Sequence, residues 1–256
     1  MQFKITTFNL RLNHINDKEN AWGYRLNSVI KYIKTTKPLI LGAQEVLDGM
    51  LNDLSNNLED YKYIGLTRKQ NEEANPIFYN KKILDCRESG TFWLSRSPNI
   101  PNTIDFASAC IRICTWGEFL FKDKRNIRFR VFNTHLDHIS KLAKIEGTKI
   151  IIKKVYNKNN ETKLPTIIMG DLNSTREEEV IKYIKSQKEF TDIYEYLPQS
   201  EYGSTFHNFN GIKEGTPIDF IFVSNEFKIL RPTIYRKKIL NKYPSDHYPV
   251  TTLIQL

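Results

Sequence analysis

Five short motifs place acidic, amide or imidazole side chains directly after an apolar run of the sequence. A strand end holds a side chain rigidly, so several strand ends that converge would build a pocket. Carboxylate and amide oxygens are the ligands that hard divalent cations prefer, and imidazoles can move protons or meet phosphate charge. This set of groups is typical of metal-assisted phosphoester hydrolysis. The motifs are TFNLR (7–11), QEV (44–46), NTHLDH (133–138), GDLNS (170–174) and SDHYP (245–249).

Three side chains of these motifs are candidate ligands of a divalent metal ion, which we expect to be Mg²⁺ or Mn²⁺. Glu45 follows a short buried strand, where a carboxylate is a natural Mg²⁺ ligand; the alternative is a capping glutamate before the next helix. Asn9 ends the first strand, and its amide can ligate the metal or orient Glu45. Asp246 can bind the same ion or polarise a neighbouring group. Because Mg²⁺ retains several waters, one or two carboxylates are sufficient.

Asp171 and Asn173 are separated by one residue, so both side chains point the same way from an extended segment. We predict that Asp171 orients or deprotonates the attacking water and that Asn173 donates a hydrogen bond to a phosphoryl oxygen. The alternative is an Asx turn before the next helix, because Asp and Asn favour such turns. His247 can act as a base on water or, when protonated, stabilise the pentacovalent phosphorane.

Helical and strand-like patterns are mixed along the whole chain. No linker rich in Pro, Gly or Ser divides the sequence, so we expect a single domain over residues 1–256 in which two sheets pack together beneath helices. Apolar residues at helical spacing predict helices at 22–33, 50–58, 140–156 and 176–186. Strands are predicted at 3–9, 39–43, 61–67, 76–80, 83–94, 111–121, 127–134, 165–169, 217–223, 231–236 and 248–254.

The chain carries a formal net charge of +9. A basic surface favours polyanionic partners such as nucleic acid or anionic lipid. The alternative is a composition bias, since Lys, Asn and Ile are abundant throughout the sequence. The charge alone therefore leaves the substrate open.

Cysteine use and hydropathy indicate the compartment. Cys86, Cys110 and Cys114 form a sparse, odd-numbered set, which argues for buried thiols in a reducing compartment and against a disulfide framework. No apolar run approaches the ~20 residues that span a bilayer, and no signal-peptide pattern precedes the first strand. We expect a cytoplasmic protein without stable membrane association, unless a leader has been removed, and no obligate protein partner is evident.

The ordered motifs resemble those of the endonuclease/exonuclease/phosphatase superfamily, which includes DNase I, abasic-site endonucleases, deadenylases, inositol polyphosphate 5-phosphatases and neutral sphingomyelinases. The resemblance extends from Asn9 to Pro249. It implies an α/β (α+β) fold of the DNase I type, a four-layer α/β sandwich in which two packed mixed β-sheets are flanked by helices. The active site would lie at one edge of the two sheets. Segments similar to the small bacterial branch are NPIFY (75–79), GTFWL (90–94), RICTW (112–116) and GSTFH (203–207).

The resemblance also implies roles for individual residues. It implies that Glu45 binds the essential metal, that His135 lies against the phosphate and that Asp219 holds His247. The alternatives are a core histidine with satisfied hydrogen bonds at 135 and a strand-edge carboxylate at 219. Asp219 lies inside the apolar run IDFIF (218–222), where a carboxylate is costly unless it is paired, and this favours the functional interpretation.

Three further residues are candidates for substrate contact. Arg112 is expected on a central strand facing the cleft, where a guanidinium can meet phosphate; the alternative is a cross-strand salt bridge. Tyr79 and His207, like Trp93, Trp116 and Phe206, are candidates for the cleft walls, where aromatic rings can stack on bases. The alternative for each of these rings is a place in the hydrophobic core.

These inferences predict a Mg²⁺- or Mn²⁺-dependent phosphoric ester hydrolase that uses in-line attack of an activated water. The first hypothesis is a phosphodiesterase or nuclease acting on nucleic acid or nucleotides. The alternatives are a small-molecule phosphatase for an inositol or sugar phosphate, a sphingomyelinase-like phosphodiesterase, and a catalytically silent binding module. The predicted partner is thus a phosphoester substrate, with nucleic acid among the candidates. We expect specificity to reside in the loops 95–106 and 200–215.

Overall fold

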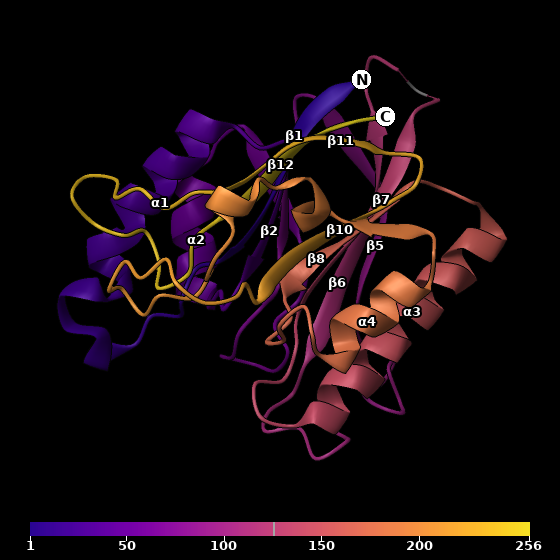
Figure 1. The fold of residues 1–256 in the computed structure, drawn as a ribbon, viewed down its shortest axis with the longest axis horizontal. Coiled ribbons are helices and arrows are strands. Elements are labelled where there is room, and N and C mark those ends of the chain that lie inside the picture. The colour runs from indigo at the N-terminus through magenta and orange to yellow at the C-terminus, as the bar shows by residue number, and fades with distance from the viewer. Residues whose placement is uncertain (125) are drawn as a thin grey trace.

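The computed structural model describes residues 1–124 and 126–256. Two six-stranded mixed sheets pack face to face, and a pair of helices covers the outer face of each sheet, which gives four layers (Figure 1). This arrangement confirms the predicted fold class. The predicted helices and strands are all present with shifted ends, whereas the short edge strand β9 (Phe190–Asp192) and three 3₁₀ helices were not predicted.

The first sheet contains the N-terminal and C-terminal strands of the chain. Its outer face packs against α1 (Trp22–Thr36) and α2 (Asp48–Asn57), which share a hydrophobic cluster with it. Only β1 and β2 run parallel in this sheet. In spatial order its strands are β11 (Lys228–Ile234), β12 (Val250–Gln255), β1 (Gln2–Asn9), β2 (Ile40–Gln44), β4 (Ile77–Asn80) and β3 (Tyr61–Ile64).

The second sheet is built from the middle of the chain. Its outer face is covered by α3 (Lys141–Glu161) and α4 (Glu179–Ser186), seen together in Figure 1. Its one parallel pair is β7 and β8. In spatial order its strands are β5 (Leu84–Trp93), β6 (Ile113–Phe121), β7 (Arg128–His135), β8 (Thr166–Asp171), β10 (Asp219–Ser224) and then β9.

Each sheet therefore has one central parallel pair, and both pairs end at the same edge of the molecule. Asn9 and Gln44 are register partners at the ends of β1 and β2, and Glu45 follows at once. His135 and Asp171 are register partners at the ends of β7 and β8. Parallel neighbours deliver their terminal side chains side by side, so these motif residues meet at this edge.

A buried amide joins the two sheets close to that edge. Asn133 donates from Nδ2 to the carbonyls of Ala43 (2.8 Å) and Pro76 (3.0 Å), and its Oδ1 accepts from Gln44 Nε2 (2.7 Å). Gly42 makes room for it, because a Cβ at this position would lie 2.7 Å from Asn133 Oδ1. Since a buried amide is costly unless all its groups are paired, this network fixes how the sheets sit at the edge that carries the motifs.

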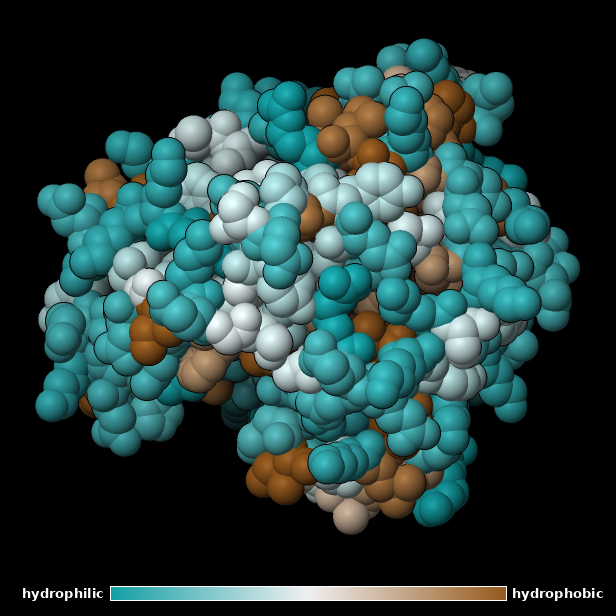
Figure 2. Space-filling view, in the orientation of Figure 1, coloured by the Kyte–Doolittle hydropathy of each residue, from teal (hydrophilic) through white to brown (hydrophobic). Residues whose placement is uncertain are grey.

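On the face drawn in Figure 2, most side chains are hydrophilic and the hydrophobic ones form small separate patches. Among residues 1–124 and 126–256, no helix combines the length and the apolar content needed to cross a membrane. The two termini lie side by side (Figure 1), because β1 and β12 are antiparallel neighbours.

Gly170, directly before Asp171, permits the close approach of β7 and β8. Its φ is +151°, and a Cβ would lie 1.9 Å from the carbonyl oxygen of Thr134. We expect Gly170→Ala to lower the free energy of unfolding by about 1–3 kcal/mol and to reduce kcat, because Asp171 must shift away from His135. Urea unfolding and steady-state kinetics measure the two effects.

The matched control is Gly23→Ala in α1, where an added Cβ meets nothing within 4 Å. Alanine is favoured over glycine inside a helix by about 0.5–1 kcal/mol, so this variant should be slightly more stable than the wild type and equally active. If Gly170→Ala matched the wild type in stability and kcat, the role assigned to this close approach would be wrong.

Candidate active site

A cleft of about 440 Å³ opens at the edge where the four strand ends meet. It brings together most of the predicted site residues, which come from segments far apart in the sequence. Asn9 and Asp219 do not line the cleft, but each is hydrogen-bonded to a residue that does. The predicted residues that line it are Glu45, Arg112, His135, Asp171, Asn173, Asp246 and His247.

Asp171 is the centre of the constellation. Its Oδ2 accepts a hydrogen bond from Asn9 Nδ2 (2.9 Å) and lies 3.6 Å from His135 Nε2 and 3.7 Å from His247 Nε2. Burial raises the pKa of Asp171 to about 7, the charge of Asp219 adds to the rise, and His247 opposes it. A carboxylate whose pKa lies near neutrality is well suited to hold and then accept a proton from water.

The alternative proposed for Asp171 and Asn173, an Asx turn, is also present. Asp171 Oδ1 accepts from the backbone N–H of Asn173 at 2.9 Å. The turn and the site position are compatible, because this bond fixes the orientation of the carboxylate that faces the cleft. The Asn173 side chain donates to the carbonyl of Leu136 (3.0 Å), and Lys144 Nζ donates to the carbonyl of Asn173 (2.7 Å).

The two histidines beside Asp171 are held in opposite protonation states. His247 Nδ1 lies 2.9 Å from Asp219 Oδ2. Burial lowers the pKa of His247, but the charge and hydrogen bond of Asp219, with the charges of Asp171 and Asp246, raise it well above its usual range. Burial lowers the pKa of His135 well below its usual range, and the charge of Arg112 lowers it further. At neutral pH the site therefore contains one imidazolium, His247, and one neutral imidazole, His135.

Glu45 is oriented by two hydrogen bonds. Its Oε1 accepts from Asn9 Nδ2 and its Oε2 from the backbone N–H of Leu12, each at 3.0 Å. The capping alternative for Glu45 is not observed, since α2 has Leu47 as its N-cap residue and no side-chain cap. Asn9 Oδ1 accepts from the N–H of Arg11 (2.9 Å), so the Asn9 amide orients Glu45 and Asp171 at once.

Asp246 supplies a second carboxylate to the same part of the cleft. Burial raises the pKa of Asp246, and the charge of Glu45 raises it further. Its nearest cation, Arg11 Nε, is 3.8 Å away and is already paired with Asp17 at 2.9 Å. Two carboxylates in one cleft are a donor set that fits a divalent cation, and Mg²⁺ is bound by such small sets with waters completing its shell.

A second group of possible ligand atoms belongs to Asp171, Asp219 and His247, which lie within 4.8 Å of one another. A histidine must be neutral to ligate a metal ion. Because the pKa of His247 is raised by the Asp219 carboxylate, we assign this group to proton and charge positioning. Glu45 and Asp246 are the better candidates for holding a metal.

Three residues of the site have left-handed backbone conformations without being glycine. The φ angles are 55° for Arg11, 58° for Glu45 and 45° for Asn173. Such conformations cost on the order of 1–3 kcal/mol each and persist where the surroundings fix them, which is common at active sites. The strained backbone thus coincides with the strand ends that carry the candidate groups.

Arg112 lines the cleft, although not from a strand. It precedes β6, its side chain is 7% exposed, and its Nη2 lies 3.1 Å from His138 Nδ1. Its Nε is 3.8 Å from Asp137 Oδ2 and has no hydrogen-bond partner among the described residues. The alternative, a cross-strand salt bridge, is not seen among the described residues, and Arg112 instead contacts the segment after β7.

The structure does not place Tyr79 or His207 in the cleft, which corrects the prediction that they contact the substrate. Tyr79 pairs with Ile40 at the far end of the first sheet, and its ring packs on Phe119 at 5.2 Å in the core. His207 is buried and stacks on Tyr248 at 3.8 Å. Its backbone N–H donates to the carbonyl of Asp246 (2.8 Å), so its contribution to the site is indirect.

The analysis of the sequence missed the cleft residues Leu12, Arg68, Glu73, Cys110 and Ile218. Arg68 and Glu73 lie between two predicted strands, 61–67 and 76–80, and the shortness of that connection was the signal that could have identified a hairpin-like loop. Of the two loops expected to carry specificity, 200–215 contributes Phe206 to the cleft lining, and 95–106 contributes nothing to it.

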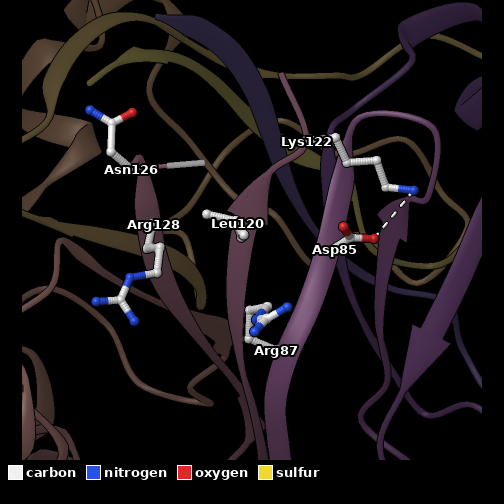
Figure 3. Close-up of a pocket in the computed structure, with 6 residues that line it drawn as sticks. All are labelled: Asp85, Arg87, Leu120, Lys122, Asn126 and Arg128. Atoms are coloured by element: carbon white, nitrogen blue, oxygen red, sulfur yellow. Dashed lines mark ion pairs between the residues drawn. The ribbon is translucent and has the colours of Figure 1, made fainter. Parts of the chain in front are cut away.

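A larger hollow of about 880 Å³ lies at the opposite edge of the second sheet (Figure 3). It sits where β5 begins, β6 ends and β7 begins, and it is crossed by an ion pair between Asp85 and Lys122 (3.2 Å). The residues drawn there contain one carboxylate and no imidazole. Size alone therefore does not locate the chemistry, and the smaller cleft has the convergent groups.

The pKa of Asp171 predicts an acid limb in the pH profile. If Asp171 must be ionised to accept a proton, kcat falls as pH falls through its pKa, which burial raises to about 7. A bound cation favours the ionised form and moves the limb below that value. Measuring kcat from about pH 5 to about pH 9 tests this. A rate that rises as pH falls over this range would mean that Asp171 acts as an acid instead.

Comparison with known proteins gives the class of this chain. The sequence profile of the Endonuclease/Exonuclease/phosphatase family matches residues 6–247, so the chain belongs to that family, whose members are phosphoester hydrolases. No curated protein matches the sequence.

Solved structures agree with this assignment. An endonuclease/exonuclease/phosphatase from Bacteroides vulgatus is 30% identical, with a TM-score of 0.92 and coverage of 100% of this chain and 99% of that chain. A mannosyl-6-phosphatase from Bacteroides thetaiotaomicron is 29% identical, with a TM-score of 0.92 and coverage of 99% and 100%. TDP2 from D. rerio, complexed with single strand DNA product, is 15% identical with a TM-score of 0.76 and coverage of 100% and 99%, a likeness of fold alone.

Proposed function

We propose that this protein is a Mg²⁺- or Mn²⁺-dependent phosphatase acting on a small phosphorylated metabolite. The observation that carries the proposal is the position of Asp171. This buried carboxylate lies 3.6 Å from His135 Nε2 and 3.7 Å from His247 Nε2, and it shares the Asn9 amide with Glu45. A base, a cationic donor and a metal ligand are thus held within one cleft.

In the proposed reaction Asp171 holds the attacking water and takes its proton. His247, kept protonated by Asp219, donates a hydrogen bond to a phosphoryl oxygen as negative charge develops there. Glu45 and Asp246 would hold the metal ion, and Asn9 keeps Glu45 in place. When bound, the ion supplies Lewis-acid polarisation of the phosphoryl group and charge stabilisation of the leaving oxygen.

The lining of the cleft favours a compact substrate over nucleic acid. Tyr79, Trp93, Trp116 and His207 are buried outside the lining, so Phe206 is the one predicted stacking ring that reaches it. The volume, about 440 Å³, is that of a small-ligand site. The likeness to a mannosyl-6-phosphatase supports a sugar phosphate as the substrate class.

A nuclease or phosphodiesterase is the second candidate. It is favoured by the net charge of +9, which attracts polyanions. Phe206 is 43% exposed and offers one platform on which a base could stack.

Two chromogenic substrates separate these functions. Hydrolysis of p-nitrophenyl phosphate and bis(p-nitrophenyl) phosphate is compared with Mg²⁺, with Mn²⁺ and with EDTA. We expect metal-dependent cleavage of the monoester, followed by release of phosphate from mannose 6-phosphate. Cleavage of the diester alone would support the second candidate, and no metal-dependent cleavage of either would contradict the proposed function.

A further inference from the structure

One wall of the cleft takes no part in the chemistry described above. It is formed by a hairpin-like loop over residues 67–74, which contributes Arg68 and Glu73. Thr67 and Ala74 form a β-bridge, the N–H of Arg68 donates to the carbonyl of Glu73 (2.8 Å), and Ala74 bridges to Val46. The loop is therefore fixed directly beside Glu45.

The Arg68 side chain is held in one orientation. Its Nε donates to Glu72 (2.8 Å) and its Nη1 to Glu73 (3.3 Å), and Nη1 lies 3.4 Å from the sulfur of Cys110. The indole of Trp93 donates to the Arg68 carbonyl at 3.0 Å. A guanidinium fixed in this way presents a planar set of donors without a large entropy cost on binding.

Glu73 and Arg112 have unused hydrogen-bonding capacity in the same wall. The Glu73 side chain is 14% exposed, and its carboxylate accepts only the long bond from Arg68 among the described residues. Arg112 uses one N–H, toward His138. The charge of Arg112 acts on the pKa of Glu73, which places the two groups near each other, although burial dominates and raises that pKa.

The positive charges of this wall are offset by neighbouring carboxylates. The guanidinium of Arg68 is offset by Glu72 and Glu73, and that of Arg112 has Asp137 beside it. A second phosphate would therefore find no excess of positive charge here. A hydroxyl group suits it better, because a hydroxyl both donates and accepts, and the wall offers guanidinium donors next to a carboxylate acceptor.

We propose that Arg68 and Glu73 form a subsite for adjacent hydroxyl groups, so that the substrate is a phosphomonoester of a sugar or another polyol. This inference rests on the proposed function and adds the residues that bind the group attached to the phosphate. One hydroxyl accepts from Arg68 and its neighbour donates to Glu73. The apolar side chains of Leu12, Ile218 and Phe206 in the same cleft offer surface to the C–H face of a ring.

The test compares mannose 6-phosphate with hexyl phosphate, a chain of the same carbon number that has no hydroxyls. We expect the wild type to prefer the sugar phosphate by at least about 100-fold in kcat/KM, since sites built for hydroxyl groups reject analogues that lack them. Glu73→Gln and Arg68→Met should each lower this preference about tenfold or more, mainly through the KM of the sugar phosphate.

Glu161→Gln is the matched control. Glu161 also forms an ion pair, with Lys158, but neither residue lines the cleft, so its replacement should change the preference by less than about threefold, as for an exposed ion pair. Thermal unfolding of each variant shows that it is folded, and Glu73→Gln, which keeps the shape of the side chain, provides the result if Arg68→Met is unstable.

The outcomes distinguish the two levels of the proposal. If the wild type hydrolyses neither substrate with Mg²⁺ or Mn²⁺, the proposed function itself fails. The hydroxyl subsite is overturned if the wild type hydrolyses both substrates without preference. It is also overturned if folded Glu73→Gln and Arg68→Met keep the wild-type preference, or if their kcat/KM falls equally for both substrates.

Discussion

Asp171→Asn is expected to lower kcat by about 10²- to 10⁴-fold, the usual contribution of a general base. An asparagine preserves the shape of the side chain, but its single carbonyl oxygen can accept from only one of the two donors, Asn9 Nδ2 or the N–H of Asn173. It cannot take the proton of a water. The loss should therefore appear in kcat with little change in KM, because the substrate contacts remain.

The same substitution should also change how the stability of the protein depends on pH. In the unfolded chain the carboxyl of Asp171 loses its proton near its ordinary pKa of 3.8, whereas burial raises the pKa to about 7 in the folded state. Between these values the folded state binds more protons, so the stability of the wild type falls as pH rises. The variant lacks this cost, so the difference in stability should shift in favour of the variant by about 1–2 kcal/mol between about pH 4 and about pH 7.

The measurement is urea unfolding of both proteins at several pH values, combined with kcat for p-nitrophenyl phosphate. The difference in stability should move in favour of the variant as pH rises from about 4 toward about 7. Asp192→Asn is the matched control, since burial also raises the pKa of Asp192, to about 6, but this residue lies on the edge strand β9 outside the cleft. Its replacement should leave kcat within about twofold of the wild type. Equal losses of kcat in the two variants would show that Asp171 has no special role.

The sequence predicted the site best where local pattern and chemistry coincide. Asn9, Glu45, His135 and Asp171 each follow an apolar run, and buried strands with a polar residue at the end are readable from such patterns. What the pattern could not give is which strands are neighbours. The parallel pairs β1–β2 and β7–β8 bring these ends together through long-range contacts that no short segment encodes.

Contacts between side chains that are far apart in the sequence were harder to predict. The contact between Asp219 and His247 was expected only through the family resemblance. It depends on the register of β10 beside β8, which places Asp219 opposite Asp171, and this register cannot be derived from the sequence pattern. Arg112 was expected in the cleft, but its partners in the segment after β7 were not. Its actual contacts depend on where β6 begins, and strand ends are the least certain part of any reading of a sequence.

Aromatic and loop residues show the limit of such a reading. Tyr79, His207 and Phe206 have similar sequence contexts, yet two are in the core and one lines the cleft, because packing from distant elements decides their burial. Arg68 and Glu73 could be identified as cleft residues only once the conformation of the loop 67–74 was known. Their charges in the sequence resemble those of any exposed turn.

Glu45→Gln is expected to weaken metal binding and to lower kcat/KM at subsaturating Mg²⁺, each by at least about 10- to 100-fold. Both carboxylate oxygens of Glu45 accept hydrogen bonds from N–H donors, Asn9 Nδ2 and the Leu12 backbone. A glutamine must turn its own NH₂ group toward one of these donors, so it loses a bond that orients it as well as the charge. Asp246 then remains as the single carboxylate of the proposed metal site.

Calorimetric titration with Mn²⁺ reports the affinity without relying on turnover. Glu146→Gln is a control of the same chemistry, because Glu146 lies on α3 and pairs only with Lys149 among the described residues. It should bind metal and turn over substrate like the wild type. Asp246→Asn should weaken the affinity in the same direction as Glu45→Gln, since both carboxylates would hold the ion. If Glu45→Gln kept the wild-type affinity for Mn²⁺ and full turnover at low Mg²⁺, both the ligand assignment and the metal-dependent reaction built on it would have to be abandoned.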